Sequence, residues 1–418
     1  MKSANSNTTL FFLTTSFPFG ALEPLINDEI IALSKVFSKI IIISSSNFDK
    51  QLYAVPDNVE VLHHNIKLSF FEKLRSLTRI FSRDLKQEKN SIKKVSEGRF
   101  DFKKFKISLI ANEKAERFLT YLKDIIASRI ILDDNLHFYS YWCEDEVIGL
   151  AKLKRKQPSY KVVTRMHAYD LYFERHSPAF LPMRKLILDQ VNHVLCISEQ
   201  GKLYLEGKFK QKFKSLNVNR LGIHSDKPFS INKEELTFNI VSCSAMIALK
   251  RIDLIIDTIA HCPLNLKLHW THFGDGDLEG KIKSYCSKKL SHLNHITYDF
   301  KGFVEQKSIL DCYAESNFHL FINLSETEGV PISIMEAMCH GIPTLATDVG
   351  AVSELINKGS GFLVDKNSSS IEIWDILHSY ISLGEQDKIN FQRNAFNLWK
   401  SEFNAKNNEN KLMSFLLD

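Results

Sequence analysis

The chain has 418 residues, of which 44% are hydrophobic and 25% charged, a composition that excludes a disordered or fibrous protein. Its formal net charge is only +5, and no apolar run approaches the ~20 residues that a membrane-spanning helix needs. The seven cysteines are scattered singly and form no CxxC pair, which argues against a disulfide framework and favours a reducing cytoplasm.

Short runs of β-branched and aromatic residues alternate with segments of helical period along nearly the whole chain. In the first half the predicted strands are Leu10–Thr15, Lys39–Ser44, Val59–His63, Leu136–Tyr141, Lys161–Arg165 and His193–Ile197. In the second half they are Asn239–Ser242, Lys267–Phe273, Ile296–Phe300, Phe318–Ile322, Pro343–Thr347 and Gly361–Val364. Such alternation predicts an α/β fold with two doubly wound, Rossmann-like parallel sheets. The polar stretch Ser225–Thr237 is the predicted linker, between an N-terminal domain at 1–224 and a C-terminal domain at 237–397.

A basic stretch follows the third predicted strand, where residues 71–110 carry twelve Lys or Arg against five Asp or Glu. Apolar residues recur at helical spacing at its start: Phe70, Phe71, Leu74, Leu77, Ile80 and Phe81. Two interpretations stay open, a helix lying on an anionic membrane surface or a helix packed on its own domain with a solvated basic face. Nucleic acid is not a predicted partner, because aromatic and basic residues do not interleave in a known reader motif.

Glycine usage indicates that the second domain holds the principal ligand site, since nine of the 16 glycines fall between Gly274 and Gly361. There a polar turn at 325–329 leads to Pro331 and a predicted helix over 332–340. Free amides at a helix start favour phosphate or sugar oxygens, and the carboxylates of Glu328 and Glu336 can accept hydrogen bonds from vicinal hydroxyls. These groups suit a nucleotide sugar, although two glutamates at this spacing also fit an exposed acidic loop and a solvated helix.

The whole segment Asn323–Glu354 resembles the signature of family 4 of the retaining glycosyltransferases, of the bacterial surface-polysaccharide type, which have the GT-B fold. The Glu-x7-Glu motif of that family corresponds to Glu328–Glu336, and its continuation to Gly341–Pro343 and Gly350–Glu354. Further segments that resemble the family are Phe17–Glu29, Arg165–Asp170, Val241–Arg251, Phe273–Gly276 and Lys301–Val304. One position departs from the family pattern, because Ala245 stands where an arginine is common.

The resemblance implies a metal-independent hexosyl or other glycosyl transferase that moves a sugar from a nucleoside-diphosphate sugar to an acceptor hydroxyl, with retention of configuration and without a cofactor. It implies a role in cell-surface polysaccharide or glycolipid synthesis, with a saccharide or lipid-linked saccharide as acceptor. It also implies two domains that face each other across a cleft, an acceptor site in the first, and a C-terminal helix at about 398–418 that packs back on the first domain.

The same resemblance assigns the site residues. His167, Glu328 and Lys250 are implied at the transferring sugar and the leaving phosphate, and Glu336 at the ribose hydroxyls. The other residues implied in donor binding are Gly20, Arg251, Gly274, Phe303, Val304, Gly329, Val330 and Pro331. Asp275-Gly-Asp277 is predicted to be a turn, and no metal site is assigned.

Two alternatives remain. The first is a catalytically silent nucleotide-sugar-binding partner, whose support is Ala245 at the position where an arginine is common. The second is a sugar-nucleotide epimerase, which would need acid/base carboxylates of its own. The expected location is the cytoplasm, either free or peripheral on the inner face of the membrane, with residues 70–110 as the membrane contact.

Overall fold

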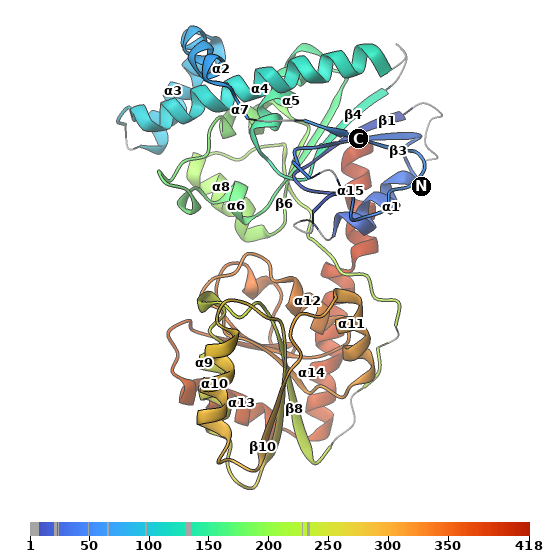
Figure 1. Ribbon diagram of the computed structural model, residues 1–418, viewed down its shortest axis with the longest axis vertical. Helices are drawn as coiled ribbons and strands as arrows, with labels where there is room; N and C mark the ends of the chain where they lie inside the picture. The colour runs from blue at the N-terminus through green and yellow to red at the C-terminus, as the bar shows by residue number, and fades with distance from the viewer. Residues whose placement is uncertain are drawn as a thin grey trace. The chain divides into compact units, whose positions relative to one another are not determined.

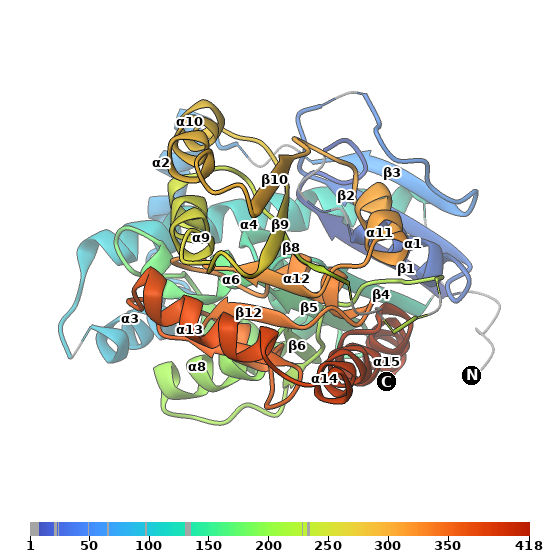
Figure 2. The same ribbon diagram turned by 90° about the horizontal axis from the view of Figure 1, so that it is seen from below.

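The computed structural model describes residues 8–20, 23, 25–48, 50–64, 67–96, 98–129, 135–227, 229–231 and 235–418. The chain divides into two compact units, one of Met1–Asn219 with Glu409–Asp418 and the other of Arg220–Asn408. Each unit is a parallel sheet with helices on both faces (Figures 1 and 2), which confirms the predicted pair of doubly wound sheets. The domain boundaries at 224 and 237 and the cleft stay predictions, and part of the predicted linker, 228 and 232–234, lies outside the described residues.

The sheet of the first unit has seven strands in the order β3-β2-β1-β4-β5-β6-β7, all parallel. The strands are β1 (Thr8–Thr14), β2 (Lys39–Ser44), β3 (Val59–His63), β4 (Asn135–Ser140), β5 (Lys161–Met166), β6 (His193–Cys196) and β7 (Leu216–Val218). Four consecutive buried isoleucines, Ile40 to Ile43, make β2 a strand covered on both faces. The last strand, β7, was not predicted, because its three residues are too short for a pattern to show.

Alternate residues of β1 enter two different cores. Leu10 and Phe12 pack with α1 (Ile26–Ser34) and with Leu412 of α15 (Ala405–Leu417), whereas Phe11 and Leu13 face the opposite side. The α-helices whose residues share that opposite core are α3 (Arg83–Val95), α4 (Phe102–Arg129), α5 (Asp145–Lys156), α6 (Ala168–Leu171), α7 (Arg184–Gln190) and α8 (Glu199–Phe209). The strand order reverses between β1 and β4, which is where doubly wound sheets bind ligands, at the carboxyl ends of the strands.

The sheet of the second unit has six parallel strands in the order β10-β9-β8-β11-β12-β13, so its reversal lies between β8 and β11. The strands are β8 (Thr237–Cys243), β9 (Lys267–Phe273), β10 (Ile296–Phe300), β11 (Leu320–Asn323), β12 (Thr344–Thr347) and β13 (Gly361–Val364). Figures 1 and 2 show α9 (Ile252–Ile259), α10 (Glu279–Leu290) and α13 (Ser370–Ile381) on one face. On the other face lie α11 (Gln306–Glu315), α12 (Ile332–Met338) and α14 (Glu385–Leu398).

The basic stretch forms α2 (Phe70–Arg75), the 3-10 turn η1 (Ser76–Arg79) and α3. Arg75 and Arg79 attach α2 and η1 to α4, with N–O distances of 2.6 and 2.8 Å to the fully buried carboxylate of Glu113. The apolar side chains on this stretch are nevertheless exposed: Phe70, Phe71, Leu74, Leu77 and Phe81. Ile80, the sixth apolar residue, packs partly against the core of its own unit, so both interpretations of this stretch stay open.

None of the helices in the described part of the chain combines the length and the apolarity that crossing a bilayer requires.

Glu88 of α3 links this helix to its neighbours, because its Oε1 accepts hydrogen bonds from Met183 N at 2.7 Å and Ser108 Oγ at 3.1 Å. Burial raises the pKa of Glu88 from 4.5 to about 7. A raised carboxyl pKa means that the folded chain holds a proton that the unfolded chain has released. The contribution of Glu88 to stability therefore falls as the pH rises from about 4.5 to about 7 and is flat above that.

We predict that Glu88→Gln removes this pH dependence. Between about pH 5 and about pH 8 the wild type should lose on the order of 2 kcal/mol of unfolding free energy relative to the variant. Thermal unfolding at the two pH values measures the difference, with Glu385→Gln as an exposed control. Parallel pH dependences of wild type and Glu88→Gln would contradict the assignment.

Candidate functional site

In the second unit, the loops that follow β8 and β11 meet at the reversal of strand order. The loop after β8 ends in the 3-10 turn η3 (Ala248–Lys250), and Glu326 N donates a hydrogen bond to Leu249 O at 2.8 Å. Next to this contact, Lys250 Nζ lies 2.7 Å from Glu328 Oε1. Lys250 and Glu328, two predicted site residues that lie 78 positions apart in the sequence, therefore form one salt bridge at the carboxyl ends of the strands.

Asn323, the last residue of β11, shapes the loop that carries Glu328. Its Oδ1 accepts hydrogen bonds from Ser325 N at 3.1 Å and Ser325 Oγ at 2.6 Å, and its Nδ2 donates to Glu328 Oε1 at 3.2 Å. The Glu328 oxygen that meets Lys250 is thus fixed from two sides. Asn323 was not predicted as a site residue, although an asparagine at the end of a buried strand is a signal for such a turn.

Glu336 lies within α12 and is only 5% exposed. Gln306 Nε2, from α11, donates a hydrogen bond to Glu336 Oε1 at 2.6 Å. Burial raises the pKa of the Glu336 carboxyl above its ordinary value, and the Gln306 hydrogen bond opposes that shift. Gln306 was not predicted, because nothing in the sequence pairs it with a residue 30 positions away.

Two glycines in this unit allow loops to approach more closely than any side chain would permit. Gly350 has φ +57°, and a Cβ there would lie 2.2 Å from Glu328 O. Gly274 has φ +129°, and its Cβ would lie 2.0 Å from Ser244 O, next to Ala245. Gly350 therefore supports the Glu328 loop, while Gly274 lets the loop after β9 pack on the loop after β8.

Arg251 follows Lys250 but points its guanidinium at backbone oxygens. Its Nε donates to Leu324 O and its Nη1 to Lys366 O, both at 2.6 Å, and its Nη2 lies 3.4 Å from Ser325 O. These contacts tie the loops after β8, β11 and β13 together. Its direct contact with a donor stays a prediction.

The remaining donor-site predictions of this unit lie in two segments. Phe303 and Val304 follow β10, and the Phe303 ring is 75% exposed. Gly329, Val330 and Pro331 precede α12, where Gly329 O accepts a hydrogen bond from Ala351 N at 3.0 Å. Their roles toward a ligand stay predictions.

In the first unit, His167 follows β5 and lies against two aromatic rings, with centroid distances of 4.7 Å to Tyr141 and 4.2 Å to Trp142. The ring is buried, and neither ring nitrogen has a hydrogen-bond partner among the described residues. Burial first, and the charge of Arg165 second, hold the pKa of His167 well below its ordinary value. The imidazole is therefore neutral and offers one donor and one acceptor.

Glu23, which was not predicted as a site residue, organises the loop after β1. Its carboxylate accepts backbone hydrogen bonds from Thr15 N at 3.0 Å and from Ser16 N and Phe17 N at 2.7 Å. It also accepts the indole N–H of Trp142 at 2.7 Å. The carboxylate of Glu23 therefore already accepts hydrogen bonds from three backbone N–H groups of this loop. Gly20, whose own N–H donates to Ser16 O at 2.9 Å, stays a prediction as a donor contact.

The model of a protein family matches most of the second unit. Residues 225–396 match the model of the family "Glycosyl transferases group 1". This stretch contains Lys250, Glu328, Gly350 and Glu336.

The curated relatives are distant and mostly match over part of their length. An uncharacterized glycosyltransferase of Methanocaldococcus jannaschii is 26% identical over 277 residues, which cover 64% of this chain and 73% of that protein. The O-antigen biosynthesis glycosyltransferase WbnH of Escherichia coli is 30% identical over 140 residues, 34% of this chain and 37% of WbnH. Several others match over about half of their own length or less.

Solved structures match nearly the whole chain. The crystal structure of Anabaena HepE in complex with UDP and glucose has a TM-score of 0.60 at 15% identity and covers 98% of this chain and 99% of that one. The lipopolysaccharide outer core galactosyltransferase WaaB, in its apo form, has a TM-score of 0.62 at 15% identity, with 96% and 98% covered. The two sheets thus have the GT-B fold, as predicted.

We predict that Gly350→Ala lowers the free energy of unfolding by about 1–3 kcal/mol, because the added Cβ meets Glu328 O and the backbone is left-handed there. Gly280→Ala is the matched control, since a Cβ at this helical position has no neighbour within 4 Å. Urea unfolding measures both variants. If the two variants have the same free energy of unfolding, the backbone at residue 350 does not pack tightly against Glu328 O, and the prediction is wrong.

Proposed function

We propose that the chain is a glycosyltransferase that moves a sugar from a nucleoside-diphosphate sugar to an acceptor hydroxyl, in cell-surface polysaccharide or glycolipid synthesis. The observation that carries the proposal is the Lys250–Glu328 salt bridge, with buried Glu336 nearby in sequence, inside the stretch that matches the glycosyltransferase family. The solved complex of HepE with UDP and glucose, a neighbour in fold, supports a nucleotide-sugar donor.

In this proposal, side chains of opposite charge bind different parts of the nucleotide-sugar donor. Lys250 gives the diphosphate a point charge, and the carboxylate of Glu328 accepts hydrogen bonds from hydroxyls of the donor sugar. Glu336 accepts hydrogen bonds from the ribose, held in place by Gln306. The exposed ring of Phe303 supplies an apolar surface for the base. The contacts of Arg251 favour a positioning role, because they fix the loop that carries Glu328.

The reaction breaks the bond between the anomeric carbon and the leaving phosphate oxygen, and forms a bond to the acceptor oxygen with retention of configuration. The acceptor proton passes to the leaving phosphate, so the step needs neither a metal nor a protein nucleophile. Lys250 stabilises the charge that develops on the diphosphate. The neutral His167, whose ring nitrogens have no partner among the described residues, orients a hydroxyl of the transferring sugar or the acceptor.

We further propose that the acceptor is reached at an anionic membrane surface, in keeping with a cytoplasmic location on its inner face. The support is the exposed apolar side chains of α2 and η1, with Phe71 80% and Phe81 79% exposed, in a basic stretch. Arg75 and Arg79 are occupied by Glu113, whereas Lys73 and Arg83 are exposed and form no salt bridge with a described residue. Lys73 and Arg83 are therefore cations that can meet lipid phosphate.

We predict that Lys250→Ala and Glu336→Ala each weaken nucleoside-diphosphate binding at least about tenfold, whereas His167→Ala leaves this affinity within about twofold and slows transfer. Calorimetric titration with UDP, GDP and ADP measures the affinity, and Lys358→Ala, an exposed lysine of the same unit, is the control. Labelled donors then report whether the label moves to an acceptor, isomerises or stays. Unchanged binding and turnover in Glu336→Ala would overturn the site assignment.

We predict that the chain binds vesicles of phosphatidylglycerol and phosphatidylcholine in a salt-sensitive manner, and that Lys73→Gln with Arg83→Gln weakens this binding by about fivefold or more. Co-sedimentation measures the bound fraction, with Lys400→Gln and Lys406→Gln as a control of equal charge. Absence of binding at low salt would remove the membrane proposal and leave the glycosyltransferase proposal standing.

A further inference from the structure

Asp170, the third residue of the short helix α6, joins two neighbouring loops of the first unit. It is only 2% exposed. Its Oδ1 accepts a hydrogen bond from His167 N at 2.6 Å, and its Oδ2 accepts one from Cys143 N, also at 2.6 Å. His167 directly follows β5, and Cys143 lies in the loop after β4, which pairs with β5. One carboxylate therefore holds the loops after two adjacent strands together.

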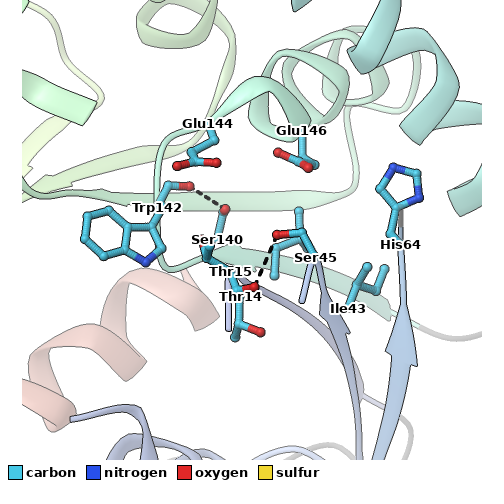
Figure 3. A pocket seen from close by; sticks show the side chains of 10 residues that line it. Thr14, Thr15, Ile43, Ser45, His64, Ser140, Trp142, Glu144 and Glu146 are labelled. Carbon is cyan, nitrogen blue, oxygen red and sulfur yellow. Dashed lines mark hydrogen bonds between the residues drawn. The ribbon is translucent and has the colours of Figure 1, made fainter. Parts of the chain in front are cut away.

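These two hydrogen bonds fix both sides of the ring contact at His167. The imidazole packs against Trp142 at a centroid distance of 4.2 Å, and Cys143 is the next residue along the chain after Trp142. The Trp142 carbonyl oxygen also accepts a hydrogen bond from Ser140 Oγ at 2.6 Å (Figure 3). Neither imidazole nitrogen has a partner among the described residues. The position of the imidazole therefore depends on its own backbone and on the indole beside it.

Asp170 is fixed at its backbone as well as at its carboxylate. Arg184 of α7, itself 4% exposed, donates hydrogen bonds to Asp170 O from Nε at 3.3 Å and from Nη2 at 3.0 Å. Burial raises the pKa of Asp170 from 3.8 to about 7, although the two backbone N–H groups and the charge of Arg184 oppose this rise. At pH 8 the carboxylate form prevails, and this form can accept both hydrogen bonds.

A side chain that only closed the first turn of a helix would need one acceptor within that turn. Ser198 is such a residue, because its Oγ accepts a hydrogen bond from Gly201 N at 3.0 Å at the start of α8. Asp170 differs, since its second oxygen binds a backbone N–H that lies 27 positions earlier, in the loop that carries the indole. Its geometry therefore serves the contact between the two loops as well as the helix.

We propose that Asp170 is a positioning residue for the sugar transfer. By holding the backbones of His167 and Cys143 at once, it sets the orientation of the imidazole against the Trp142 indole. The inference rests on the proposed function, because Asp170 acts through the role given there to His167. Orientation matters at this position, since a displacement of about 1 Å at a reacting centre can lower a rate on the order of a hundredfold.

Fluorine NMR of the full chain labelled with 5-fluorotryptophan reports the surroundings of the Trp142 ring without any substrate. The chain has four tryptophans, and Trp142→Phe identifies the signal of this one. Asp170→Asn should shift the Trp142 signal by more than its linewidth and leave the other three in place, because the amide has one acceptor oxygen for two N–H groups. Ser198→Ala is the matched control and should leave the Trp142 signal unmoved. An unmoved Trp142 signal in Asp170→Asn overturns the proposal.

Transfer from a labelled donor at pH 8 tests the link to His167. Asp170→Asn should lower kcat about tenfold or more and leave the affinity for the nucleoside diphosphate within about twofold. In the His167→Ala background the same change should lower kcat by no more than about twofold, because no imidazole is left to orient. An equal loss of kcat in both backgrounds would mean that Asp170 does not act through His167, and this result overturns the proposal.

Thermal unfolding checks that each variant is folded. If Asp170→Asn does not fold, Asp170→Ser replaces it, since the smaller side chain keeps an acceptor but lacks the second oxygen. The failure of this inference is distinct from that of the proposed function. A wild type that binds no nucleoside diphosphate and transfers no sugar overturns the proposed function and, with it, the inference. A wild type that transfers sugar, with Asp170→Asn as active as Ser198→Ala, overturns the inference alone.

Discussion

The salt bridge between Lys250 and Glu328 is the interaction on which the candidate donor site depends. It joins the loops after β8 and β11 where the strand order reverses, and Asn323 and Gly350 hold the Glu328 side of it in place. A site for a nucleotide sugar needs a cation for phosphate and an anion for hydroxyls, and either charge alone in a half-buried loop would be costly. As a pair, each charge neutralises the other.

The first unit uses a carboxylate in a related way. Glu23 gathers three backbone amides of the loop after β1 and the indole of Trp142, and this indole supports His167. A buried imidazole whose nitrogens have no partner among the described residues is costly, and the fixed indole packs against this ring. Both units therefore place preorganised polar groups at the carboxyl ends of parallel strands.

The sequence predicts the sheets well, because each buried strand is a dense apolar run between helical segments, as Ile40 to Ile43 illustrates. The Glu328–Glu336 segment can also be predicted from the sequence, because the two glutamates and the glycines that mark it lie close together along the chain. Gln306 and Glu23 are not, because their importance lies in partners that only the fold brings near. The periodicity of 70–81 finds the apolar side chains but not their burial: Ile80 packs partly against the core, whereas the other five are exposed.

The most direct test of the account is a structure of the chain with UDP bound. We expect a phosphate oxygen within hydrogen-bonding distance of Lys250 Nζ and the ribose hydroxyls against the Glu336 carboxylate. A nucleotide bound elsewhere, with the Lys250–Glu328 pair intact and Glu336 still paired only with Gln306, would contradict it.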